Sequence, residues 1–204
     1  MKKLYFKYGT MNSGKTMEIL RTAYNHEENG FKVALIKPGV DLKGNEEIVS
    51  RNGSHRKVDY KIPFDKMPSD IINLKSIDAI LVDEAQFLSK EQIDDLWLIT
   101  KEKNITVFCY GLKTDFKSNG FPGAIRLFEI ADKIEEITTL CKCGNKAMFN
   151  LRKNDGIPTF NGDIVLIDGI TNNITYEPVC GLCYIKELKK FKEKGFTKQT
   201  KLFL

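Results

Sequence analysis

Eight consecutive residues near the start of the chain have the types and spacing needed to bind a phosphate group. The stretch Gly9-Thr10-Met11-Asn12-Ser13-Gly14-Lys15-Thr16 fits the pattern G-x-x-x-x-G-K-[ST] at every defined position. In such a loop the glycines let successive backbone N–H groups point at phosphate oxygens, and the helix that follows adds the positive end of its dipole. Lys15 then reaches the β- and γ-phosphates of a nucleotide, and the Thr16 hydroxyl is a ligand for Mg²⁺. The alternative, a chance match in a glycine-containing turn, is disfavoured because a strand-like run precedes the loop and a helical pattern follows it.

A second chemical feature is an acidic pair at the end of an apolar run. The four apolar residues 79–82 lead directly into Asp83 and Glu84. A strand that is covered on both faces need not alternate, so this run is typical of a central parallel strand that ends at a nucleotide site. We expect Asp83 to hold Mg²⁺, directly or through water, and Glu84 to point into the site. We assign the next two residues, Ala85 and Gln86, to the same cofactor-binding segment.

Four of the five cysteines form two tight pairs. Cys141 and Cys143 make the first pair, Cys180 and Cys183 make the second, and 36 residues lie between them. Four thiolates in two glycine-bearing turns suit tetrahedral Zn²⁺ in a structural site, with no position left open for catalysis. Reduced free thiols are the alternative. A metal is expected here because about 45 residues bury too little core on their own. The fifth cysteine, Cys109, fits a small buried apolar side chain inside a strand.

Hydrophobic periodicity predicts the elements that position these residues. Residues 4–8 form a strand, and an apolar face at helical spacing, with Met17, Ile19, Leu20, Ala23 and Tyr24, continues from the phosphate loop to Gly30. The order strand, helix, strand is the unit of a parallel sheet, so the fold class is α/β. The further strands expected in this sheet are 33–36, 79–82 and 105–110, and the further helices are 91–103 and about 123–132.

After this α/β part, the pattern of alternating strands and helices gives way to cysteine pairs and hairpin signals. We place a nucleotide-binding α/β domain at residues 1–138 and a zinc-binding β domain with a basic C-terminal tail at 139–204. Turn signals at Asn45 and Asn52-Gly53 indicate a loop or hairpin within the polar segment 40–61. The segments expected to form hairpins of the small domain are 157–158, 161–162, 164–167 and 174–176.

The positive charge of the chain is concentrated at one end. The net charge is +5, and residues 186–204 alone carry seven lysines against two glutamates. The other 185 residues balance at 25 basic and 25 acidic, which is unlike a generally basic nucleic-acid binder. A solvated, partly disordered tail is favoured over a tail that contacts nucleic acid or an acidic partner. Neither a signal peptide nor a membrane span can be placed, so we expect a cytoplasmic protein without membrane contact.

Taken together, these motifs resemble the type II thymidine kinase family, found in cytosol and in many bacteria. The resemblance covers about residues 3–184 and rests on the order and spacing of the motifs. They are Gly9 to Thr16 with Met11 inside it, Ser50-Arg51-Asn52-Gly53, Asp83-Glu84-Ala85-Gln86-Phe87, Gly111 to Phe116, and the two cysteine pairs with Tyr176 four residues before Cys180.

The resemblance implies ATP-dependent, Mg²⁺-assisted phosphorylation of the 5′-hydroxyl of thymidine. It implies a RecA-like core and a zinc-ribbon domain that carries a lasso-like loop over the nucleoside. It also implies a homotetramer that thymidine triphosphate inhibits. Lys15 and Glu84 resemble the catalytic residues, with Glu84 as the general base that accepts the hydroxyl proton. The positions that resemble those enclosing the thymine are Met11, Phe87, Leu112, Phe116 and Tyr176; apart from the resemblance, Met11, Phe87 and Leu112 fit ordinary core packing.

Four features depart from the family pattern and bear on specificity. Lys43, in Asp41-Leu42-Lys43, stands where an arginine is usual and replaces a forked guanidinium by a point charge. Lys113 replaces a frequent aspartate, and Asn150 stands where threonine is common. The loop from Asp168-Gly169 to Tyr176 is about three residues longer than expected.

Two functions of other classes compete with a kinase. A zinc-ribbon ATPase that binds nucleic acid predicts basic residues interleaved with aromatic ones on the ribbon. Between the cysteine pairs, however, the acidic residues outnumber the basic ones, which are Lys146, Arg152 and Lys153. An inactive binding module is disfavoured because Lys15 and Glu84 are both retained.

Overall fold

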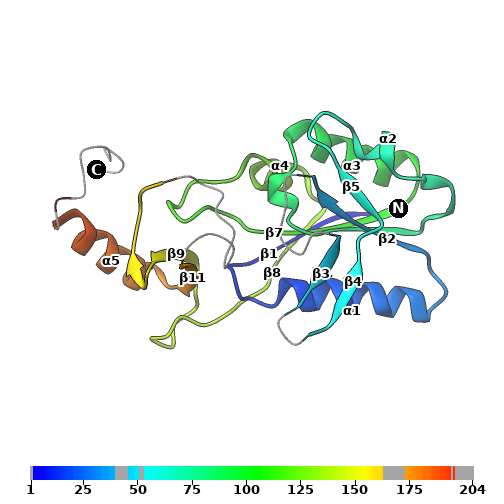
Figure 1. Ribbon diagram of the computed structural model, residues 1–204. Coiled ribbons are helices and arrows are strands. Elements are labelled where there is room, and N and C mark those ends of the chain that lie inside the picture. Colours follow the sequence, from blue (N-terminus) through cyan, green and yellow to red (C-terminus); the bar gives the residue numbers. More distant parts are fainter. Residues whose placement is uncertain (1, 40–45, 51–52, 163–172, 194, 196–204) are drawn as a thin grey trace. The chain divides into compact units, whose positions relative to one another are not determined.

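A six-stranded parallel sheet forms the centre of the larger part of the chain (Figure 1). The structure is a computed structural model, and it describes all residues except 1, 40–45, 51–52, 163–172, 194 and 196–204. The strand order is β5-β2-β6-β7-β1-β8, and every neighbouring pair is parallel. The strands are β1 (Leu4–Tyr8), β2 (Val33–Pro38), β5 (Tyr60–Ile62), β6 (Ala79–Val82), β7 (Thr106–Gly111) and β8 (Lys133–Glu136).

The described residues divide into two compact units. The first comprises residues 1–9, 13–113 and 120–137, and the second comprises 10–12, 114–119 and 138–204, apart from the positions that the structure does not describe. The sheet belongs to the first unit. The tip of the phosphate loop, residues 10–12, is grouped with the second.

Helices cover both faces of the parallel sheet. One apolar cluster packs Ile19 and Ala23 of α1 (Lys15–Glu28) against Leu35 and Leu81 on one face. A second cluster packs the other face against α3 (Lys90–Glu102) and α4 (Pro122–Ile130), which lie across the sheet from α1 in Figure 1. Because both faces are buried, all four residues of β6 are shielded from solvent, which explains its continuous apolar run. This unit also contains α2 (Pro68–Ile71) and the 3₁₀ turns η1 (Leu74–Ser76) and η2 (Ala85–Phe87).

The predicted α/β fold is confirmed, with corrections at the edges of the sheet. The sheet contains β8 after α4, where no strand was predicted. The segment 40–61 includes the expected hairpin, β3 (Glu47–Val49) with β4 (His55–Lys57), and also supplies edge strand β5. Met17 and Tyr24, predicted on the apolar face of α1, are more than half exposed. As expected, Cys109 is fully buried in β7.

A small antiparallel sheet forms the second unit. Its strands are β9 (Phe149–Asn154), β10 (Ile157–Pro158) and β11 (Ile174–Val179), in the order β10-β9-β11. The helix α5 (Gly181–Glu193) follows, and its residue Tyr184 stacks on Phe149 with ring centroids 4.8 Å apart. The predicted strands 157–158 and 174–176 are confirmed, and β9 was not predicted. The tail was predicted to be partly disordered from residue 186, but residues 186–193 belong to α5.

Several sequence-based expectations lie outside the described residues. They concern Asp41 to Lys43, Arg51-Asn52, the strand 164–167, the lasso-like loop around Asp168-Gly169, and the lysines of the tail at 194 and beyond 195. Among the described residues, no helix is long and apolar enough to cross a membrane.

Candidate active site and cysteine cluster

The phosphate-loop motif joins β1 to α1. Gly14 adopts a left-handed conformation with φ 88° and is the N-cap of α1, which begins at Lys15. In the described structure no side chain caps the first turn of this helix. No capping side chain therefore accepts a hydrogen bond from the first N–H groups of the helix, and the positive end of the helix dipole is available to an anion.

The start of the loop is a tight cradle that only glycine fits. A Cβ on Gly9 would lie 2.4 Å from Oγ of Ser13 and 2.5 Å from the carbonyl oxygen of Ile137. Among the described residues, this Ser13 Oγ is buried without a hydrogen-bond partner. Nζ of Lys15, a side chain that is 9% exposed, lies 3.4 Å from the carbonyl oxygen of Gly9. A buried unsatisfied hydroxyl and a buried ammonium at one tight loop fit the phosphate groups of a nucleotide.

The acidic pair lies at the same edge of the sheet as the phosphate loop. Strand β7 lies between β6 and β1, and these three parallel strands end at Gly111, Val82 and Tyr8 respectively, so that Asp83 directly follows β6 and Gly9 directly follows β1. The N–H of Gly9 donates to the carbonyl oxygen of Gly111 at 3.2 Å, which ties two of these ends together. Ligands of open parallel sheets bind at this carboxyl edge. Asp83 is nearly buried there, and its carboxylate accepts a hydrogen bond from the N–H of Glu84 at 3.0 Å.

Glu84 has an unusual backbone and a fixed carboxylate. Its φ of 51° and ψ of 38° place it in the left-handed region, which disfavours residues with a Cβ and is often found at functional sites. The carboxylate Oε2 accepts a hydrogen bond of 2.6 Å from Nε2 of Gln86. The Gln86 side chain, which the sequence analysis assigned to the nucleotide, is 1% exposed and bonded within the protein. Only the structure shows this contact with Glu84.

The five residues assigned to the thymine fall into both units. Phe87 and Leu112 belong to the first unit, where they are partly buried against the core, and the ring of Phe87 contacts Phe121 edge-on at 5.5 Å. Met11, Phe116 and Tyr176 belong to the second.

Asn150 holds the tip of the phosphate loop inside the second unit. The N–H of Met11 donates to Oδ1 of Asn150 at 2.8 Å, and Nδ2 of Asn150 donates to the carbonyl oxygen of Thr114 at 3.3 Å. Nδ2 of Asn12 lies 3.5 Å from the carbonyl oxygen of Tyr176. The asparagine that departs from the family pattern therefore connects β9 with the loop tip and with the segment 114–119.

Arg152 is a buried cation whose burial the sequence did not predict. It is 2% exposed, and its guanidinium carbon lies 3.6 Å from the ring centroid of Phe116. The hydroxyl of Tyr184 donates to the carbonyl oxygen of Phe116 at 2.8 Å. Arg152 was counted among the basic residues of the ribbon, but at this burial it presents no charge to a nucleic-acid backbone.

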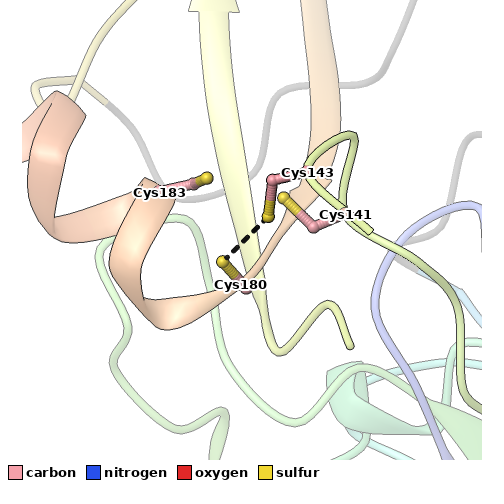
Figure 2. Close-up of side chains that lie close together, drawn as sticks. All are labelled: Cys141, Cys143, Cys180 and Cys183. Atoms are coloured by element: carbon pink, nitrogen blue, oxygen red, sulfur yellow. Dashed lines mark hydrogen bonds between the residues drawn. The ribbon is translucent and has the colours of Figure 1, made fainter. Parts of the chain in front are cut away.

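The four paired cysteines come together in the second unit. Figure 2 shows the two side chains of the hairpin turn, Cys141 and Cys143, converging with Cys180 and Cys183 from the start of α5. Their sulfur atoms all lie within 4.8 Å of one another, and the Sγ atoms of Cys143 and Cys180 are 3.5 Å apart. A tetrahedral site with Zn–S bonds of about 2.3 Å has sulfur–sulfur edges of about 3.8 Å. The cluster is therefore close to the size that Zn²⁺ requires.

Comparisons with known proteins agree with these motifs. A family model described as "Thymidine kinase" matches residues 2–184. A protein named thymidine kinase from Streptococcus pyogenes serotype M28 is 42% identical over 186 residues, covering 88% of this chain and 95% of the relative. Another protein of that name, from Streptococcus agalactiae serotype V, is 42% identical over 183 residues with the same coverage.

Proposed function

The chain belongs to the thymidine kinase family, and on this premise we propose that it transfers the γ-phosphate of ATP to the 5′-hydroxyl of thymidine. The observation that carries the proposal is the meeting of the phosphate loop and the acidic pair at one edge of the parallel sheet. Phosphoryl transfer needs positive charge, alignment of the two oxygens and acceptance of a proton. The residues at this edge provide groups for each of these tasks.

Lys15 and the backbone of the loop bind the phosphates. The cradle at Gly9 and the buried hydroxyl of Ser13 are suited to the phosphate oxygens, and the Lys15 ammonium neutralises charge that develops during transfer. Thr16 and Asp83 are the residues that would hold Mg²⁺, which when bound supplies further charge neutralisation on the phosphates. A hydroxyl and a carboxylate are the oxygen ligands that this ion prefers.

Glu84 acts as the general base. Its carboxylate follows β6 at the carboxyl edge of the sheet, and it accepts the proton of the 5′-hydroxyl as the oxygen attacks the γ-phosphate. Among the described residues, Oε1 of Glu84 has no hydrogen-bond partner, so one oxygen remains for the substrate. The family resemblance supports the assignment of Met11, Phe87, Leu112, Phe116 and Tyr176 as the residues that bind the thymine.

The remaining assignments concern organisation. Residues 1–138 act as the nucleotide-binding domain, and residues 139–204 form the domain in which Cys141, Cys143, Cys180 and Cys183 hold a structural Zn²⁺. The active form is a cytoplasmic homotetramer inhibited by thymidine triphosphate, as the family resemblance implies. Mass measurement in solution and titration with thymidine triphosphate test these two points.

A nucleoside panel tests the proposed reaction. ATP labelled on the γ-phosphate is incubated with Mg²⁺ and thymidine, deoxyuridine, deoxycytidine or deoxyadenosine, and a parallel reaction contains DNA without nucleoside. We expect labelled thymidine monophosphate and no stimulation of ATP hydrolysis by DNA. If no nucleoside is labelled while DNA stimulates hydrolysis, the kinase proposal fails and the zinc-ribbon ATPase replaces it.

A further inference from the structure

The side chain of Gln86 is buried between the candidate base and the end of a neighbouring strand. Its Nε2 donates to Oε2 of Glu84 at 2.6 Å, and its Oε1 accepts from the N–H of Leu112 at 3.0 Å. The residue is 1% exposed. Both ends of one carboxamide are therefore used within the protein, one on Glu84, two residues before Gln86, and the other on Leu112, 26 residues after it.

The chemistry of the two partners fixes the orientation of this amide. A backbone N–H can only donate, so the carbonyl oxygen of the Gln86 amide must face Leu112. The amino group is then left for Glu84, whose carboxylate is an acceptor. The orientation follows from the hydrogen-bonding partners and does not depend on telling oxygen from nitrogen in the amide.

The backbone around Gln86 leaves space for this side chain because Gly111 has no Cβ. A Cβ on Gly111 would lie 2.6 Å from Oε1 of Gln86 and 3.2 Å from its backbone nitrogen. A Cβ at this position would displace the Gln86 amide, so the close approach of β7 to the η2 turn favours glycine here. Glu84 itself is in the left-handed region, a conformation that costs on the order of 1–3 kcal/mol and persists only when neighbouring structure holds it.

We propose that Gln86 is a positioning residue for phosphoryl transfer, which fixes the carboxylate of Glu84 through one amide hydrogen bond and anchors it to the end of β7 through the other. This proposal rests on the role of Glu84 in the proposed function. A free glutamate side chain samples several rotamers, whereas the bond to Oε2 restricts the carboxylate and leaves Oε1 to accept the hydroxyl proton. The effect of Gln86 is thus on the rate of transfer and not on ligand binding.

Two substitutions at Gln86 test the role. Gln86→Met keeps the length of the side chain and removes both hydrogen bonds. Gln86→Glu keeps the acceptor for the N–H of Leu112 and replaces the donor to Glu84 by a second carboxylate, so it tests the role if the methionine variant does not fold. We expect each to lower kcat by about 10- to 100-fold, with KM for thymidine and ATP changed less than about threefold.

Gln92 provides the matched control. It is also 1% exposed, and its amide is also used within the protein, accepting from the N–H of Ser89 and donating to the carbonyl oxygens of Pro63 and Lys66. Gln92→Met removes these bonds without touching Glu84. We expect it to lower the temperature of unfolding while kcat, measured well below that temperature, stays within about twofold of wild type.

A double-mutant cycle with Glu84→Gln shows whether Gln86 acts through the base. Adding Gln86→Met to Glu84→Gln is expected to lower kcat by less than about threefold, because the carboxylate to be positioned is already gone. The proposal is overturned if the fold-reduction in kcat of the double variant equals the product of the fold-reductions of the two single variants. It is also overturned if Gln92→Met lowers kcat as much as Gln86→Met does, or if the Gln86 variants raise KM and leave kcat unchanged. If Glu84→Gln alone keeps the wild-type rate, the base assignment falls and this proposal with it. If Glu84→Gln lowers kcat but the fold-reductions of the two single variants multiply in the double variant, only the Gln86 proposal fails.

Discussion

If the cysteine cluster holds the proposed structural Zn²⁺, removal of this metal is expected to unfold the second unit. Three large apolar side chains of its core cluster, Leu151, Phe160 and Val179, are at most 9% exposed. Burying them contributes about 5–9 kcal/mol at 1.5–3 kcal/mol each. Zinc binding to a comparable set of thiolates contributes about 10–16 kcal/mol. Zn²⁺ bound to the four cysteines would therefore contribute at least as much stability to this unit as these apolar residues do.

Cys141→Ser is the perturbation that tests this estimate, and Cys109→Ala is its control. Cys141 is one of the four clustered cysteines, whereas Cys109 lies in β7, where burial raises the pKa of its thiol far above the ordinary value and keeps it protonated. We expect one Zn²⁺ per chain, by elemental analysis, in the wild type and in Cys109→Ala, and less than half of this amount in Cys141→Ser.

Limited proteolysis measures the structural consequence. The described part of segment 138–193, which is residues 138–162 and 173–193, should become sensitive to protease in Cys141→Ser and in wild-type protein treated with a strong chelator. The reasoning is refuted if Cys141→Ser keeps one zinc per chain, or if metal-free wild-type protein resists proteolysis in this segment as well as the metal-bound form does.

Two further predictions concern stability. Asn150→Leu removes the acceptor of the Met11 N–H and is expected to lower the free energy of unfolding, measured by denaturant titration, by about 1–3 kcal/mol. Asn150→Asp keeps an acceptor and is the control. An equal loss of unfolding free energy in both variants would contradict this assignment. Lys7 contacts Glu18 and Glu135 at 3.1 Å each. Burial alone would raise the pKa of Glu18, but hydrogen bonds, including one from Lys7, outweigh it and hold this pKa below its ordinary value; for Glu135 the bonds from its lysine partners also lower the pKa. The stability that these carboxylates contribute is present above their unfolded-state pKa, near 4.5, and is lost as the pH falls through the folded values. Lys7→Met should therefore flatten the acid limb of stability against pH, and an unchanged limb would refute the coupling.

The parts of the fold that sequence predicts are those with long, uniform signals. The apolar run 79–82 and the helix around Leu96 are found because burial on both faces, or on one stripe, leaves a clear pattern. Strand β8 was missed because Lys-Ile-Glu-Glu is mostly exposed at the sheet edge and has no apolar alternation. Helix α5 was missed because its many lysines conceal an apolar stripe of Tyr184, Leu188 and Phe191, whose spacing of four and three residues could have revealed it.

Some residues of the candidate site are recognised from local sequence motifs, whereas others are recognised only from contacts between distant segments. Phosphate loops and strand-end carboxylates are local motifs, so residues 9–16 and Asp83-Glu84 follow from sequence. The role of Gln86 depends on a contact with Leu112 on another segment, and the burial of Arg152 depends on stacking against Phe116, 36 residues earlier. No local pattern encodes which distant segment will pack against a side chain, so these two assignments need the three-dimensional structure.

A single-turnover measurement of Glu84→Gln tests the central claim most directly. The enzyme, in excess over labelled ATP and saturated with thymidine and Mg²⁺, is mixed and quenched, and the rate of thymidine monophosphate formation is compared with wild type. With Glu84 as the base, the rate falls about 10²- to 10⁴-fold, while equilibrium binding of ATP and thymidine stays within about threefold of wild type. A variant that transfers phosphate at the wild-type rate, or that fails only because it no longer binds ATP or thymidine, would contradict the account.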